Sequence, residues 1–258
     1  MTSFTAFKRR DPADEAPDGL TTRRLGLAMA IYALMVLICT AVLGAAVGFP
    51  GIVDKPAGAA LRLFYGHRTV ADVFFYLFAG AGLLFSVIAI AAPRLLGAGK
   101  STFTAVFTAA GVAAGLLRCI GFLRFPLIAP QLSQQYVNTD SPAAKEAART
   151  GWLIVNAVVG EIVGDLLAFG LSAVFIAGIA YTLGRTRRFP RWWTLTGQIL
   201  SVYGLLELAT FVLPKPLTGV ASFLFPLSYA ASILWLGATG LRLYYHRSAP
   251  AVIQSTDG

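Results

Sequence analysis

Long apolar runs, separated by polar or mixed segments, dominate the pattern of this chain. Each run has roughly 20 residues or more, the length that an α-helix needs to cross the hydrocarbon core of a bilayer. The pattern therefore predicts an all-α fold, a polytopic transmembrane helix bundle of six spans. The expected spans are residues 25–48, 70–92, 102–125, 151–183, 192–213 and 220–243.

The segments outside these runs complete the expected domain organisation. Residues 1–24 mix charges of both signs with proline and glycine, so we expect a flexible cytoplasmic tail. Residues 25–245 form the six-helix transmembrane domain, and residues 246–258 form a second cytoplasmic tail. A serine followed by proline, Ser141-Pro142, is a typical helix start, so the fourth span is expected to begin near Pro142. Residues 57–65 are expected as a short interfacial helix.

Composition and charge support a membrane class. The chain is 57% hydrophobic and 13% charged, with a mean hydropathy of +0.70, whereas soluble domains average about 25% charged residues. The net charge of +9 does not indicate nucleic acid, because the basic residues cluster at the ends of apolar runs. Thirteen of them fall on the side of both termini and six on the other. This bias predicts cytoplasmic termini in a multi-pass protein of the inner (plasma) membrane, with the lipid bilayer as its partner.

Motifs for metal, cofactor or hydrolytic chemistry are missing from the sequence. His67 and His246 fall on opposite sides of the predicted membrane, so they cannot share a zinc ion. No Gly-x-Ser-x-Gly elbow is present. The stretch from Gly97 to Thr102 resembles the end of a phosphate-binding loop, but Arg94 stands where that motif needs glycine. We therefore predict no catalytic residue, no metal and no cofactor.

Carboxylates lie near the middle of the fourth apolar run. Glu161 and Asp165 are four residues apart, which places them on one helix face. Gly160 and Gly164 have the same spacing on a neighbouring face, and so do Gly111 and Gly115 in the third run, where another helix can approach closely. A charge in hydrocarbon is costly, so each carboxylate needs a partner or a water-filled site.

These carboxylates belong to a candidate ligand or proton site between spans three, four and five. At a rise of 1.5 Å per residue, Arg118 and Glu207 lie roughly 10 Å below the outer membrane face, and Glu161 lies about 15 Å below it. An unpaired charge at a helix centre costs roughly 2.5–3.5 kcal/mol, so we expect Arg118 within ion-pair reach of Glu161 or Glu207, directly or through one water. The proposed site residues are Arg118, Arg124, Glu161, Asp165 and Glu207.

The segment of residues 126–150 is expected to form a lid loop over the mouth of this site, with Pro126 and Tyr136 as its marked residues. Its length exceeds what a turn requires. A connecting loop without further function is the alternative interpretation.

Several short motifs resemble a bacterial family of six-span integral membrane proteins that is defined only as a domain of unknown function. The likeness lies in Leu123-Arg124-Phe125-Pro126, in Pro130-Gln131-Leu132 with Tyr136, and in Gly160-Glu161-Ile162-Val163-Gly164. The position of Phe125 is often tryptophan in that family, and Asp165 is not typical of it. The resemblance implies a fold and a membrane location, and no biochemical activity.

Three kinds of function fit these features. The first is a small carrier or ligand-binding membrane protein, whose charged intramembrane site is open to the outside and takes a polar or amphiphilic small molecule. The second is a structural or regulatory subunit whose buried ion pairs only fix helix packing. The third is an intramembrane enzyme with a carboxylate base, against which stands the lack of a nucleophile–base set.

Overall fold

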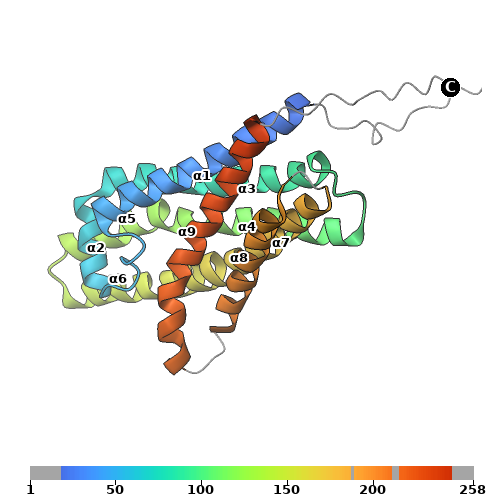
Figure 1. Cartoon of the computed structure of the whole chain (residues 1–258). Helices are drawn as coiled ribbons and strands as arrows, with labels where there is room; N and C mark the ends of the chain where they lie inside the picture. Colours follow the sequence, from blue (N-terminus) through green and yellow to red (C-terminus); the bar gives the residue numbers. More distant parts are fainter. Residues whose placement is uncertain (1–18, 187–188, 211–214, 246–258) are drawn as a thin grey trace, which may run out of the picture.

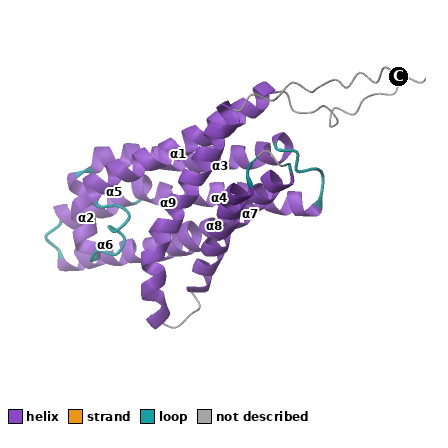
Figure 2. Cartoon of the chain, viewed as in Figure 1, coloured by secondary structure: helices purple, strands orange, loops and turns teal. Residues whose placement is uncertain are grey.

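The computed structural model describes the backbone of residues 19–186, 189–210 and 215–245, and their side chains except those of 19–20 and 207–226. Within these ranges the chain is helical, with short connections and no strand (Figure 2). Long helices are α1 (Gly19–Val47), α3 (Arg68–Leu95), α4 (Thr102–Leu127), α7 (Ala168–Arg185), α8 (Arg191–Thr210) and α9 (Lys215–Tyr245). Shorter elements are α2 (Ala57–Gly66), α5 (Ala129–Asn138), α6 (Pro142–Val155) and the π-helix η1 (Asn156–Leu167).

Several of the helices have the length and composition of membrane spans. Within the described residues, four continuous helical stretches are long and apolar enough to cross a membrane: Thr21–Val47, Arg68–Leu95, Thr102–Asn138 and Pro142–Arg185. Large apolar side chains also cover the outside of the bundle, for example Val87, which is 59% exposed, and Ile199, which is 62% exposed. Exposed apolar surface on this scale suits lipid rather than water. The predicted all-helical fold with membrane-length helices is confirmed.

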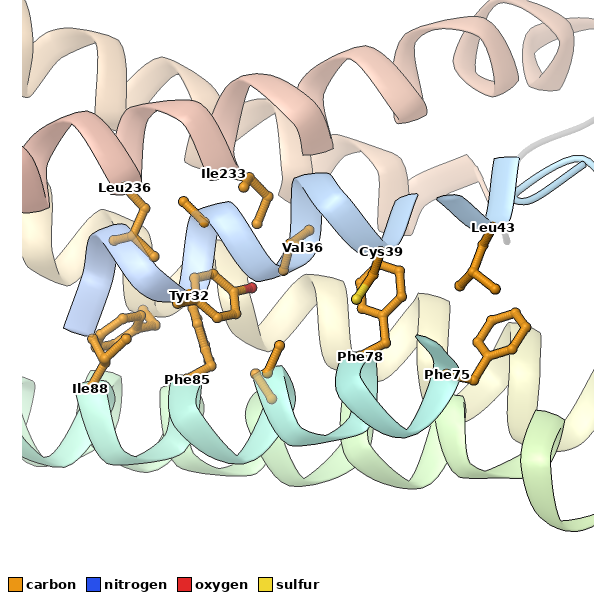
Figure 3. Packing of buried hydrophobic residues seen from close by; sticks show 14 of the residues in the cluster. Tyr32, Val36, Cys39, Leu43, Phe75, Phe78, Phe85, Ile88, Ile233 and Leu236 are labelled. Atoms are coloured by element: carbon orange, nitrogen blue, oxygen red, sulfur yellow. The ribbon is translucent and has the colours of Figure 1, made fainter. Parts of the chain in front are cut away.

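Helix α1 lies between α3 and α9, and its two faces carry much of the core (Figure 3). Toward α3, Tyr32 packs on Phe85, with ring centres 5.2 Å apart. Toward α9, glycines allow the two backbones to touch, because a β-carbon on Gly26 would lie 2.8 Å from the backbone nitrogen of Tyr244. The α1–α9 crossing therefore depends on the absence of a side chain at Gly26.

Helices α3 and α4 form the tightest long pair of the bundle. A β-carbon on Gly82 would lie 2.7 Å from the carbonyl oxygen of Gly115, so the two backbones are in contact there. The hydroxyl of Ser86 donates to the carbonyl of Val112 across the same contact, at 3.0 Å. The predicted packing role of the small pair Gly111 and Gly115 is confirmed, since Gly111 faces α3 and α7 in the same way.

Three short helices, α2, α5 and α6, gather at one end of the bundle, which we call the cap (Figure 1). Aromatic rings attach the cap to the long helices. Phe64 of α2 lies 5.5 Å from Phe125 of α4 and 5.3 Å from Trp152 of α6, measured between ring centres. Phe125 in turn stacks on Phe75 of α3 at 3.9 Å. The expected short helix at residues 57–65 is confirmed as α2.

The prediction of a loop at residues 126–150 was wrong in its secondary structure. Pro126 lies in the last turn of α4, and most of the segment that follows is helix α5 or α6. The length of the segment suggested a loop, yet Pro130 and Pro142 both stand in first turns of helices, where a missing N–H costs nothing. Ser141 caps α6 as predicted, and its hydroxyl accepts a hydrogen bond from the amide of Ala144 at 3.4 Å.

The fourth apolar run is one continuous helical stretch from α6 through η1 to α7, and its middle is not α-helical. The π-helix η1 has the wider i→i+5 turn and carries Glu161 and Asp165. It packs against α4 at a glycine contact, where a β-carbon on Gly121 would lie 3.2 Å from the α-carbon of Gly164. The carboxylates of the fourth span, Glu161 and Asp165, therefore lie on a π-helical segment within the span.

Candidate functional site

Arg118, near the middle of α4, is enclosed by aromatic side chains from four helices. Only 6% of the residue is exposed. Its guanidinium carbon lies 5.0 Å from the ring centre of Phe85, 5.2 Å from that of Phe169 and 5.4 Å from that of Tyr229. Its Nη1 donates a hydrogen bond to the hydroxyl of Tyr32. Ring faces attract a cation, more strongly when water is excluded, so this cage stabilises the buried charge in part.

A small cavity of about 30 Å³ lies beside Arg118. Small polar side chains, Ser172, Ser228 and Ser232, line it together with Gly204. The Nε of Arg118 is buried and has no hydrogen-bond partner among the described side chains. The space is about the size of one water molecule. Apolar side chains, among them Ile176 and Leu200, complete the lining, so the cavity combines one cationic side chain with a mostly apolar wall.

The expected direct ion pair between Arg118 and Glu161 is not formed. Among the described side chains, ion pairs join Arg68 to Asp72 and Arg149 to Glu146. Glu207, the other expected partner, has a side chain outside the described residues, so that pairing stays a prediction. Counting residues predicted how deep each side chain lies, but not the direction in which it leaves its helix. On helices of 3.6 residues per turn, Arg118 and the carboxylates point in different directions.

Arg124 is the arginine that faces η1. It is 8% exposed, and its Nη1 donates to the carbonyl of Gly121 at 2.8 Å, while its Nη2 donates to Oδ1 of Asn156 at 3.2 Å. Gly160 makes room for it, since a β-carbon there would lie 2.7 Å from Nη2. The guanidinium also lies 4.2 Å from the ring centre of Phe125. Its Nε, like that of Arg118, is buried and has no hydrogen-bond partner in the described part of the chain.

The two carboxylates of the fourth span lie near Arg124 rather than Arg118. Asp165 and Glu161 both act electrostatically on Arg124, with Asp165 the stronger. Neither is within the 4 Å of an ion pair, and Asp165 is half-buried while Glu161 is exposed on the bundle surface. The structure thus brings together three of the predicted site residues, namely Arg124, Glu161 and Asp165.

Tyr136, predicted as a lid residue, lies in the cap and is buried. Its hydroxyl accepts hydrogen bonds from Nη2 of Arg149 at 3.0 Å and from Nη2 of Arg62 at 3.3 Å. These contacts join α2, α5 and α6. Pro126 is buried at the end of α4. The role of the cap as a lid stays a prediction.

Sequence reasoning missed Asn156 and the aromatic cage. Asn156 is a buried amide within an apolar run, and that isolated polar residue was a usable signal. The rings around Arg118 carried no such signal, because aromatic residues in spans usually serve packing. No group of three His, Cys, Asp or Glu side chains placed to hold a metal occurs in the described part of the chain.

Comparisons with known proteins give no relative: no family model matches the chain, and neither a curated protein nor a solved structure matches it significantly. The resemblance to a six-span family therefore stays a prediction.

Proposed function

We propose that this chain is a six-span membrane protein that binds, and carries across the bilayer, a small anion or the anionic end of an amphiphilic molecule. The site is the cavity beside Arg118. One observation carries the proposal: a guanidinium buried in the bundle belongs to a residue that lines a small cavity, and its Nε has no hydrogen-bond partner among the described side chains. The described side chains place no carboxylate in ion-pair contact with it.

The cost of burying a charge supports an anionic ligand. An arginine stays protonated in proteins, and a buried cation is expensive unless it is paired and hydrogen-bonded. The aromatic cage and Tyr32 supply part of this stabilisation. A bound anion would supply the rest through charge-assisted hydrogen bonds, which are roughly twice as strong as neutral ones.

Arg124 supports a path that continues toward the cap. It stands six residues beyond Arg118 on α4, about 9 Å along the helix axis. Its Nε also lacks a partner among the described groups, and two carboxylates lie at longer range. An anion leaving Arg118 would meet this second cation, and the nearby carboxylates would keep it from being held too tightly. The basic bias of the sequence favours a cap that faces the outside.

A binding and flux experiment tests this proposal. The purified full chain in nanodiscs is titrated with sodium acetate or sodium decanoate at constant ionic strength, with sodium gluconate as the bulky control. We expect acetate or decanoate to raise the unfolding temperature of the wild type, and Arg118→Met to abolish that rise. The exposed Arg185→Met is the matched control and should respond like the wild type. Proteoliposomes that take up labelled acetate or decanoate faster than protein-free vesicles would support transport.

A second candidate, a structural role for Arg118, has one observation in its favour: the side chain contacts rings from α1, α3, α7 and α9. The same variant separates the two. If Arg118 holds the helices together through these ring contacts, Arg118→Met alone should lower the free energy of unfolding by about 2 kcal/mol or more, the value of one desolvated cation–π contact. If its partner is a ligand, the ligand-free variant should be as stable as the wild type or more so. Loss of stability with no anion effect in the wild type would contradict binding.

A further inference from the structure

Two arginines of the cap converge on a single hydroxyl. Arg149 of α6 and Arg62 of α2 both donate to the oxygen of Tyr136. Both guanidiniums also lie over its ring, with their carbons 5.3 and 5.5 Å from the ring centre. The two cations are thus held around one point by a buried tyrosine, although both arginines are themselves exposed.

A glycine in α2, Gly58, leaves room for the Tyr136 ring and its hydroxyl. A β-carbon on Gly58 would lie 2.9 Å from Cζ of Tyr136 and would collide with its hydroxyl. The carbonyl of Gly58 also accepts a hydrogen bond from Nε of Arg62, at 3.3 Å. Backbone and ring therefore fix the position of the Arg62 side chain before any ligand arrives, which lowers the entropy cost of binding.

The charge at this point is unbalanced among the described side chains. The charged groups that act on the Tyr136 oxygen are Arg149, Arg62 and Lys145, all of them cations. The described carboxylate within ion-pair reach is Glu146, 3.3 Å from Nη1 of Arg149. Both members of that pair are well exposed, and such pairs contribute little.

We propose that the cap holds a phosphate-type oxyanion between Arg62 and Arg149. Each guanidinium keeps N–H groups that the described contacts leave free, namely Nη1 of Arg62 and Nε of Arg149. A tetrahedral oxyanion offers several acceptor oxygens and suits donors from two planar forks. The anion displaces Glu146 from Arg149, and Tyr136 keeps the two forks at a fixed spacing. This site is independent of the cavity beside Arg118.

The phosphate group has two sources, a lipid headgroup or a free phosphate compound, and two probes distinguish them. The full chain in phosphatidylcholine nanodiscs is dialysed against radiolabelled inorganic phosphate at constant ionic strength. In parallel, native mass spectrometry counts phosphatidylglycerol molecules retained from mixed nanodiscs. Phosphate binding indicates the free compound, and retention of phosphatidylglycerol without phosphate binding indicates the headgroup.

Variants locate the site. Arg62→Gln and Arg149→Gln should each weaken binding of the active probe about tenfold or more, since a hydrogen bond to a charged group is worth at least one factor of ten. Arg68→Gln removes a neighbouring exposed arginine that pairs with Asp72 and should leave binding unchanged. Arg62→Lys keeps the charge but not the fork, and should bind more weakly than the wild type.

Circular dichroism and gel filtration verify that each variant is folded. If Arg149→Gln does not fold, the comparison of Arg62→Gln and Arg62→Lys with the wild type still tests the proposal. Two results would overturn the proposal. One is that neither probe binds the wild type, in which case the cluster only joins the cap helices to one another. The other is an equal loss in Arg68→Gln, which reveals diffuse attraction to a basic surface.

Discussion

Two buried arginines, six residues apart on α4, are stabilised in different ways. Arg118 meets ring faces and a phenol hydroxyl, whereas Arg124 meets a backbone carbonyl and an amide. A desolvated cation–π contact is worth about 2 kcal/mol, and a hydrogen bond to a charged group about 1.5–3 kcal/mol. Among the described side chains, neither set of contacts supplies a carboxylate in ion-pair contact, and the proposed anion site rests on this feature.

The amide of Asn156 is expected to matter out of proportion to its size. Asn156→Ala leaves Nη2 of Arg124 buried without its acceptor, so unfolding should become easier by about 1–3 kcal/mol. Asn138→Ala is the matched control, because its exposed amide only accepts from the Tyr65 hydroxyl, and its effect should stay within about 0.5 kcal/mol. Denaturant unfolding in one detergent measures both. Equal effects would mean that Arg124 does not depend on Asn156.

At the scale of residues, the sequence predicted the depth of the buried charged side chains but not which side chains would contact one another. Residue counting placed Arg118 and Glu161 at similar depths, yet it left open the faces that they occupy. The face follows from helix rotation, and the π-helix changes that rotation locally. The cage was invisible for a different reason, since rings such as Phe85 and Phe169 could pack anywhere in the bundle.

The observed long helices match the apolar runs closely. They differ from the predicted spans where short polar helices continue a span beyond the apolar run. The observed α3 and α4 lie within a few residues of the expected spans. Within the cap, α2 and the start of α6 were predicted, whereas α5 was missed because it is short and amphipathic with a proline in its first turn, a pattern that also suits loops. η1 could not be predicted, because no residue pattern distinguishes a π-turn from an α-turn in an apolar run.

The glycine contact between α3 and α4 gives a prediction for these elements. In Gly115→Ala the new methyl group would lie 2.8 Å from the backbone nitrogen of Ser86, so the helices must separate. Such overpacking typically costs about 1–3 kcal/mol. Gly80→Ala, in the same helix pair, meets nothing within 4 Å and should not destabilise the protein. Thermal unfolding in nanodiscs compares the two, and equal midpoints would refute a tight contact.

On the scale of the molecule, the exposed charged side chains of the described residues lie toward the two ends of the long helices, with the exception of Glu161 on η1. The cap carries the Arg62–Tyr136–Arg149 cluster at one end. The turn that joins α3 to α4 lies at the other end, beside the C-terminal end of α7 (Figure 1). Large apolar side chains cover the surface between these ends. This division suits a bilayer that surrounds the long helices and leaves both ends in water.

The last prediction concerns how the chain crosses that bilayer. In a variant with Cys39 and Cys119 replaced by alanine, single cysteines are placed at Asp140, in the cap, and at Lys100, in the α3–α4 turn; both positions are exposed. If the cap faces outward, as the basic bias predicts, an impermeant maleimide should label Asp140→Cys in intact cells and Lys100→Cys only after permeabilisation.

A third cysteine at Lys215, the first residue of α9, tests whether the last two helices cross the bilayer. If α8 and α9 both cross, Lys215→Cys should label from outside like Asp140→Cys. Labelling that matches Lys100→Cys instead would reduce the protein to four spans, with α8 and α9 on the inner face.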